Sequence, residues 1–238
     1  MVRFLRTWDE RNPFNGNEYR GIGFLLIDKN EDVVEGKIFH DQTDQFKHII
    51  NEEDIFVISH FKLIHNNNRY KLTEHKFRIY FTEYTIVKMV DPTSCDIIKE
   101  KFQIRLYTDL VALANKTQYL PDIIGVLVAI QGPNLQMPSS TQKIILRLLL
   151  KDNNIVKLFI WDELAAQLRS QMHRLSIRKS VIVITGVNPK IIDGIVTLST
   201  SMSTKIYMDE NLNVIKNFRL SKRRKTMVPH TVPTYHPH

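Results

Sequence analysis

The chain has 238 residues, enough for one large domain or two domains of about 100 to 150 residues. Hydrophobic residues make up 43% and charged residues 24%, which excludes the collagen-like, disordered and disulfide-rich classes. The formal net charge of +8 makes a polyanionic partner plausible, and its distribution is uneven. Residues 1–103 hold 15 Lys and Arg against 17 Asp and Glu, a net −2, whereas residues 104–238 hold 18 against 8, a net +10.

Short apolar runs with a period of two predict five strands in the first half of the chain. They lie at residues 2–8, 22–27, 33–39 and 55–64, with a last pair of runs around 70–72 and 77–81. Between the third and fourth strands, Asp41 can cap a short helix predicted over residues 41–50.

The second half repeats this order about 122 to 127 residues further along, which indicates tandem domains. Strands are predicted at 123–130, 144–150, 155–161, 181–187 and 195–200, with a helix over 162–170 after the third strand. We predict a first domain at residues 1–90, a linker at 91–119 with a short helix at 109–115, a second domain at 120–210 and a basic, disordered tail at 211–238.

This order of elements is typical of one small barrel. Five strands with a helix between the third and fourth form the OB-fold, a five-stranded Greek-key barrel whose exposed face commonly binds oligonucleotides. The sequence therefore predicts a mainly β protein made of two tandem OB-fold barrels. The fold by itself does not assign a function.

Targeting and redox signals are few. The single cysteine, Cys95, permits no internal disulfide and no cysteine-rich zinc site, which favours an intracellular, reducing compartment. The N-terminal segment carries charges from its third residue onward and has no apolar run of signal-peptide length. The longest apolar stretches, such as residues 123–130, are far shorter than the roughly 20 residues of a membrane helix. We expect neither secretion nor a membrane span.

Seven segments resemble the replication protein A large subunit. FLRTW at 4–8, FLLID at 24–28, KIFHDQTDQF at 37–46 and NNRYKL at 67–72 are similar to its first high-affinity DNA-binding domain. LPDIIGVLVAI at 120–130, LFIWDELAAQL at 158–168 and VITGVNP at 183–189 are similar to its second. The chain resembles a shortened paralogue of that subunit over about residues 1–210.

The resemblance implies a non-catalytic protein that binds single-stranded DNA with little sequence preference. Bases stack on aromatic side chains, and phosphates meet Lys and Arg. It also implies a nuclear location and a role in DNA replication, repair or recombination, with other replication protein A-like subunits or nuclear repair proteins as partners. It implies no cofactor.

The family's stacking positions fall on Phe39 and Tyr70 in the first domain and on Trp161 in the second. Arg6 and Trp8 match the family's basic and aromatic pair at the end of the first strand. Phe39 and Trp161 are also compatible with ordinary core positions, whereas Tyr70 follows three Asn in a polar turn and fits a core less well.

Three cations of the second domain could line a phosphate track, although a solvated strand face explains them nearly as well. They are Lys143, Arg147 and Lys157, on or beside predicted strands.

Two positions depart from the family pattern. Ile192 replaces the second stacking aromatic of the second domain, and Glu35 stands where the family's first domain carries an Arg. Asp9 and Glu10 add further acidic groups at the end of the first strand. Because acidic groups near a phosphate track oppose binding, we expect a lowered affinity.

The tail carries a run of cations that fits a nuclear import signal and, equally, a nonspecific contact with nucleic acid. The run is Lys222, Arg223, Arg224 and Lys225, and the expected nuclear role favours the first interpretation. Three histidines follow it, for which a solvated tail is a better explanation than a metal site: His230, His236 and His238. We assign no metal.

Catalysis is not expected, because the chain contains no GxxxxGK[ST], GxGxxG, HExxH or GxSxG motif. The adjacent acids at 52–54 read as a turn. Two alternatives to single-stranded DNA binding stay open. One is an OB-fold scaffold for protein interactions with weak DNA affinity, and the other is binding of single-stranded RNA, which stacks on the same aromatic residues.

Overall fold

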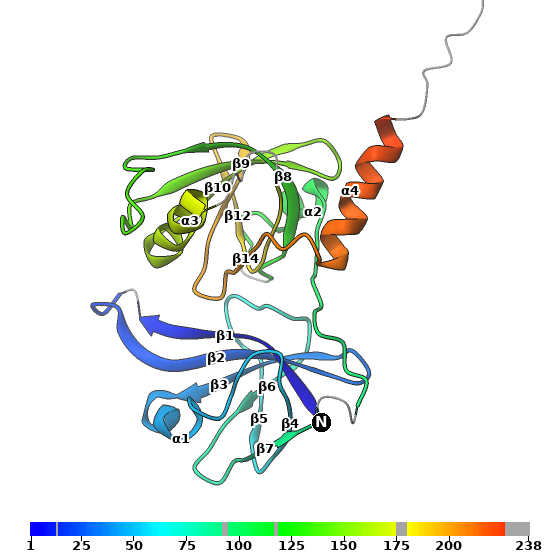
Figure 1. Ribbon diagram of the computed structural model, residues 1–238. Coiled ribbons are helices and arrows are strands. Elements are labelled where there is room, and N and C mark those ends of the chain that lie inside the picture. The colour runs from blue at the N-terminus through cyan, green and yellow to red at the C-terminus, as the bar shows by residue number, and fades with distance from the viewer. Residues whose placement is uncertain (13, 92–94, 117–118, 175–179, 227–238) are drawn as a thin grey trace, which may run out of the picture.

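The computed structural model describes residues 1–12, 14–91, 95–116, 119–174 and 180–226, apart from the side chains of residues 173–174 and 223–226. These residues fold into two barrels, each made from a curled seven-stranded sheet, and the barrels lie one above the other in Figure 1. The predicted mainly β fold of two tandem OB-fold barrels is confirmed.

The two barrels share one topology. The first contains β1 (Val2–Asn12), β2 (Glu18–Asp28), β3 (Val33–Phe39), β4 (Ile55–Ser59), β5 (Lys62–His65), β6 (Phe77–Tyr80) and β7 (Ile86–Val90), in the order β5-β6-β3-β2-β1-β4-β7. The second contains β8 (Ile123–Gln131), β9 (Ile144–Leu150), β10 (Ile155–Ile160), β11 (Val181–Ile184), β12 (Asn188–Ile192), β13 (Ile195–Ser199) and β14 (Ile206–Tyr207), in the order β12-β13-β10-β9-β8-β11-β14. The pairs β3–β6 and β10–β13 are parallel and the other neighbouring pairs are antiparallel, so each strand has a counterpart in the other barrel.

Two of the predicted strands differ from the structure. The run at 55–64 is two strands, because His60 adopts a left-handed conformation (φ 58°) that turns the chain between β4 and β5. The run around 70–72 forms no strand, and Lys71 instead makes an isolated bridge to Tyr119 in the linker.

The helices between the third and fourth predicted strands are present in both barrels. In the first, a 3-10 turn, η1 (His40–Gln42), leads into α1 (Thr43–Phe46), which is shorter than the predicted helix. In the second, α3 (Asp162–Arg174) begins where predicted and continues beyond residue 170.

Aromatic rings fill the core of the first barrel. Phe4 packs edge-on against Phe24 and Phe56 with centroids 5.3 and 5.4 Å away, and Phe81 packs on Phe24 at 5.0 Å. Gly36 belongs to this core, since a Cβ there would fall 2.0 Å from the Phe24 ring. The core of the second barrel is aliphatic, with Ile, Leu and Val from the inner faces of its strands.

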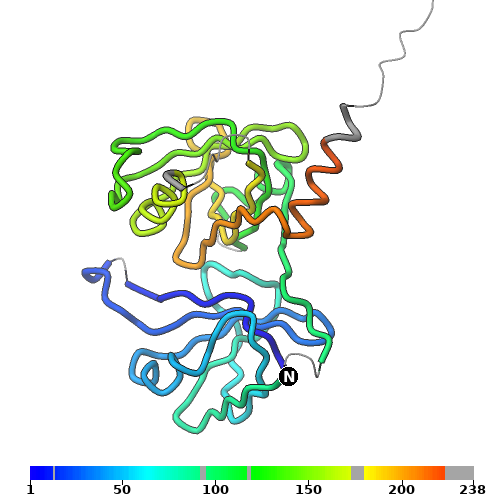
Figure 2. Tube along the Cα trace, in the orientation of Figure 1, coloured from blue at the N-terminus to red at the C-terminus, as the bar shows by residue number. Residues whose placement is uncertain are grey.

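The predicted linker at 91–119 belongs in part to the second barrel. Its helix α2 (Tyr107–Leu113) contacts β12, and Leu110 is fully buried in the second core. Asn115 accepts a hydrogen bond from the backbone N–H of Ile191 at 3.3 Å. Figure 2 shows the chain passing from the first barrel to the second along one side of the molecule.

The prediction of a disordered tail is wrong for residues 213–226, which form α4 (Asn213–Thr226) on the side of the molecule along which the linker runs. Ile215 and Phe218 are buried against Ile124 and Val183 of the second barrel. Ile215 and Phe218 have the three-residue spacing of one helical face, but the cations around them give this segment the composition of a solvated tail. The predicted tail histidines, His230, His236 and His238, lie outside the described residues.

Within the described part of the chain, no helix combines the length and the apolar character that a bilayer span requires. The same residues bring together no group of three or more His, Cys, Asp or Glu that could hold a metal ion.

The packing of α4 predicts a large loss of stability for Phe218→Ala, of about 3 kcal/mol, because the change opens a cavity over β8 and β11. Leu220→Ala on the exposed side of the same helix is the matched control and should change stability by less than about 0.5 kcal/mol. Denaturant unfolding of both variants measures the difference. Equal effects at the two positions would contradict the docking of α4.

Candidate nucleic-acid interface

A groove with a volume of about 1190 Å³ lies between the two barrels. Trp8 and Tyr70 of the first barrel and Trp161 of the second line this groove, so three of the four predicted aromatic residues face one cavity. Tyr70 keeps 39% of its surface exposed and Trp161 keeps 45%, which argues against a core position for Trp161.

Strand register places Trp8 and Phe39 on one outer face of the first barrel. Trp8 pairs with Gly23, and Gly23 pairs with Lys37, so these three residues form one row across β1, β2 and β3. Phe39 follows Lys37 by two residues on the same face, 39% exposed, and the Lys37 ammonium lies 5.1 Å from its ring centroid. Tyr80, opposite Lys37 on β6, meets the Phe39 ring edge-on at 5.2 Å.

Gly23 sets the position of Trp8. A Cβ on Gly23 would fall 2.3 Å from the indole ring of Trp8. The missing side chain therefore lets the indole lie against the backbone of β2, where it also packs against the buried cluster of Leu25, Leu72 and Leu120.

Tyr70 lies in the loop of residues 66–76 between β5 and β6, and Glu35 anchors this loop. One carboxylate oxygen of Glu35 accepts hydrogen bonds from the backbone N–H of Leu72 at 2.5 Å and of Thr73 at 3.2 Å. Glu35 is thus a positioning residue for the segment that presents Tyr70.

The structure corrects the expectation that Glu35 adds a repulsive charge to the binding face. Its side chain is 2% exposed and lies 3.5 Å from the Arg78 guanidinium. Burial raises the pKa of the Glu35 carboxyl, while Arg78 and hydrogen bonds from Leu72, Thr73 and Asn66 act in the opposite direction. An acid held in this way is largely hidden from a ligand.

Arg6 lies in the joint between the barrels and not on the open surface. It is 5% exposed, and its guanidinium is 3.7 Å from the carboxylate of Asp122 in the second barrel. This position speaks against the predicted role of Arg6 as a phosphate contact, because the side chain is neither accessible nor free of an acidic partner.

The other cations of this face are also paired with carboxylates. Glu10 lies 2.6 Å from the Lys37 ammonium and 3.5 Å from the Arg78 guanidinium. Around Phe39, the first barrel therefore offers an exposed aromatic ring beside two neutralised cations.

The second barrel has the opposite character. Arg147 pairs with Lys157, Lys157 with Thr197, and Thr197 with Lys190, so three exposed cations share one row across β9, β10, β13 and β12. Among the described residues, none of the three cations has a salt bridge to a carboxylate.

Trp161 lies beside this basic row. Phe159 precedes it on the same face, with the two ring centroids 6.5 Å apart. The ammonium of Lys143 lies 5.2 Å from both centroids, so the predicted cation and the predicted aromatic form one cluster. Lys143, Arg147 and Lys157 all lie on the face that carries Trp161, as a phosphate track requires.

Ile192 does not take the place of Tyr70 in an equivalent loop. It ends β12, and a two-residue turn of Asp193 and Gly194, both with positive φ, leads directly into β13. The first barrel has residues 66–76 at this point. The second barrel therefore lacks the loop that carries the second aromatic.

The predicted import run begins in the helix that covers the second barrel. The ammonium of Lys222 donates hydrogen bonds to the carbonyl of Leu150 at 3.1 Å and to Asn153 at 2.6 Å. Residues 223–225 continue α4, and the side chains of Arg223, Arg224 and Lys225 lie outside the described part of the structure.

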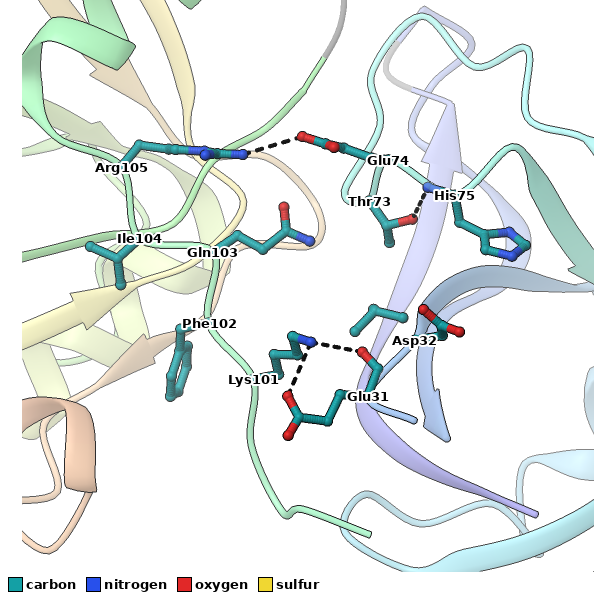
Figure 3. A pocket seen from close by; sticks show the side chains of 11 residues that line it. Glu31, Asp32, Thr73, Glu74, His75, Lys101, Phe102, Gln103, Ile104 and Arg105 are labelled. Carbon is teal, nitrogen blue, oxygen red and sulfur yellow. Dashed lines mark hydrogen bonds and ion pairs between the residues drawn. The ribbon is translucent and has the colours of Figure 1, made fainter. Parts of the chain in front are cut away.

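A second cavity, of about 570 Å³, lies where the linker passes the first barrel (Figure 3). Lys101 pairs with Glu31 at 3.2 Å, and Arg105 pairs with Glu74 at 3.3 Å. These contacts fasten the linker to the first barrel. The residues that line this cavity include none of the predicted site residues.

Comparison with known proteins finds one family model that matches the first half of the chain. Residues 1–103 match the family model described as "Domain of unknown function DUF223". This match includes all seven strands of the first barrel. No curated protein matches the chain.

Solved structures support the fold over both barrels. A chain of a replication protein A heterotrimer bound to ssDNA is 19% identical with a TM-score of 0.61, and the alignment covers 95% of this chain and 52% of that one. The protein thus spans about half the length of that relative. The p204 HINb domain is 9% identical with a TM-score of 0.50, over 87% of this chain and 95% of that one. At these identities the similarity establishes the fold alone.

Sequence reasoning missed five residues of the two faces: Lys37, Arg78, Tyr80, Phe159 and Lys190. Phe159 could have been found, since it lies two residues before Trp161 in an alternating strand. Tyr80 and Lys190 reach these faces through the parallel pairs β3–β6 and β10–β13, whose register the sequence does not reveal.

The raised pKa of Glu35 predicts a specific dependence of stability on pH. Because the folded protein holds this proton to a higher pH than the unfolded chain does, the protonated form contributes stability that is complete below about pH 4.5 and is lost as the pH rises through the folded pKa. Thermal unfolding of wild type and Glu35→Gln should show the wild type losing stability relative to the variant over that rise. A relative gain of the wild type over the same range would contradict the pKa direction.

Proposed function

We propose that the protein binds single-stranded DNA without strong sequence preference, as a relative of the replication protein A large subunit. One observation carries the proposal. The groove between the barrels collects Trp8, Tyr70 and Trp161, and at Trp161 it adjoins a face whose cations have no acidic partner among the described residues. Aromatic platforms beside a basic track are the two parts that sequence-independent binding of a single strand requires.

The two barrels contribute unequally to this binding. The first barrel supplies mainly stacking surfaces, because Lys37 and Arg78, the two cations beside Phe39, are paired with Glu10. The second barrel supplies both rings and phosphate contacts, through Trp161 and the row of Arg147 and Lys157. Most of the salt dependence of binding should therefore come from the second barrel.

Two barrels at the low end of about four nucleotides each would cover roughly eight or more nucleotides. The proposal includes a nuclear role in replication, repair or recombination, with replication protein A-like subunits or nuclear repair proteins as partners. The relative bound to ssDNA supports this assignment by its fold, and the run of cations that begins at Lys222 supports import.

The scaffold alternative is favoured by the acids of the groove, Asp9, Asp162 and Glu163. Glu35 does not favour the scaffold, because its buried carboxyl adds little charge to the binding face. Binding of RNA stays the other alternative, since stacking does not distinguish the sugars. Competition of the bound DNA with an RNA oligomer of equal length separates DNA from RNA. A scaffold would retain nuclear partners in extract treated with nuclease while showing no oligomer binding at micromolar protein.

Stacking predicts the effect of removing a ring. Fluorescence anisotropy with a labelled oligomer of about 20 deoxythymidines should show binding that is tighter at about 50 mM than at about 200 mM salt. Trp161→Ala and Phe39→Ala should each weaken it about five-fold or more, because one stacked base contributes about 1 to 3 kcal/mol. An affinity for the oligomer that neither substitution changes would refute the proposed interface.

The basic row predicts a change in salt dependence. Arg147→Gln combined with Lys157→Gln should weaken binding at low salt and reduce the slope of log K against log salt by about 1.4, for two lost phosphate contacts. Lys88→Gln with Lys216→Gln removes the same charge from exposed positions on β7 and α4 and is the matched control. If both pairs act alike, general charge and not this row explains the binding.

A further inference from the structure

The outer face of the first barrel holds a carboxylate of its own, Glu10, between two cations. The two carboxylate oxygens of Glu10 reach different partners, Oε2 the Lys37 ammonium at 2.6 Å and Oε1 the Arg78 guanidinium at 3.5 Å. The three side chains are 19%, 12% and 5% exposed in the order Glu10, Lys37 and Arg78. The carboxylate thus covers cations that would otherwise be open to the face.

Aromatic rings border both of these cations. Lys37 lies over Phe39, and the Arg78 guanidinium lies 5.6 Å from the Tyr80 centroid, while Phe39 and Tyr80 touch each other. Two cations that converge on one anion beside an exposed ring are the arrangement that binds a nucleotide, with phosphate on the cations and base on the ring.

Arg78 has unused hydrogen-bonding capacity. Its contacts with Glu10 and Glu35 are both ion pairs at 3.5 Å, and its Nε is buried with no hydrogen-bond partner among the described residues. A guanidinium carries five N–H donors and usually meets an anion through shorter, paired bonds. A tetrahedral phosphate could satisfy these donors better than the present carboxylates.

Glu10 also lies at an irregular point of its strand. The register of β1 and β2 shifts between Glu10 and Arg11, and such a bulge redirects side chains and loosens the local pairing. Glu10 can therefore leave the cations without breaking a regular ladder.

We propose that Lys37 and Arg78 form a second phosphate site, on the first barrel, and that Glu10 occupies it in the free protein until the phosphate of a nucleotide stacked on Phe39 displaces it. The inference rests on the proposed binding of single strands and adds to it. The first barrel thus has a phosphate site of its own, which Glu10 covers in the free protein. Displacing Glu10 lowers the affinity of this site for DNA.

Glu10→Gln tests the inference, since it removes the competing charge and keeps the size of the side chain. With the same oligomer of deoxythymidines, the variant should bind at least five-fold more tightly at about 50 mM salt, with a slope of log K against log salt steeper by about 0.7 for one added phosphate. Asp44→Asn is the matched control, because it breaks another carboxylate–lysine pair of the same barrel, on α1, and should leave both quantities unchanged.

A second substitution identifies the cation. Lys37→Met should cost more affinity in the Glu10→Gln background than in the wild type, because only there is Lys37 free before the ligand arrives. Thermal unfolding of each variant shows that it is folded.

Three results would overturn the inference: a folded Glu10→Gln variant with wild-type affinity, a gain that Asp44→Asn reproduces, or a gain that Lys37→Met leaves intact. A wild type that binds no oligomer and a Glu10→Gln variant that binds would support the inference while removing the proposed function of the resting protein. Failure of both to bind would refute both.

Discussion

The buried carboxylate of Asp122 joins the parts on which the candidate interface depends. It accepts hydrogen bonds at 2.9 Å from the backbone N–H of Gln103 in the linker and of Gly186 in the second barrel, and it lies 3.7 Å from Arg6 of the first barrel. A buried acid with one distant cation would be costly alone, and the two backbone donors offset that cost. Because one residue connects both barrels and the linker, the groove between them has a defined shape.

The two barrels share one topology but carry faces with different chemistry. Glu35 on β3 and Lys157 on β10 occupy equivalent places. Each lies opposite a residue of the parallel neighbouring strand, which is Arg78 on β6 for Glu35 and Thr197 on β13 for Lys157. In the first barrel, the acid is buried and its hydrogen bonds hold the loop that carries Tyr70. In the second barrel, the cation is exposed and forms no salt bridge to a carboxylate among the described residues. The same backbone position thus serves loop placement in one copy and surface charge in the other.

Strand alternation made much of this predictable from sequence. The period of two located the strands, and the repeat predicted two barrels before any register was known. Phe39 and Trp161 were identified as stacking residues through the resemblance to a known family, and the alternation placed both at the ends of equivalent strands. Arg6 could not, since whether a strand-end Arg faces solvent or a neighbouring domain depends on how the barrels dock. The disordered tail was mispredicted because composition outweighed the spacing of Ile215 and Phe218.

Fixed docking has a consequence for how a single strand would bind. Two domains on a flexible linker lose conformational freedom when one ligand engages both, and that loss subtracts from affinity. Here Leu72 of the first barrel and Leu120 beside the second share a buried cluster, and Lys205 pairs with Glu52 across the joint. The ordering is therefore completed during folding. A single DNA strand that followed the groove from Tyr70 to Trp161 would meet surfaces that are already in place. Contacts on the first barrel, where Glu10 is paired with Lys37 and Arg78, could therefore be modest and still add to the binding by the second barrel.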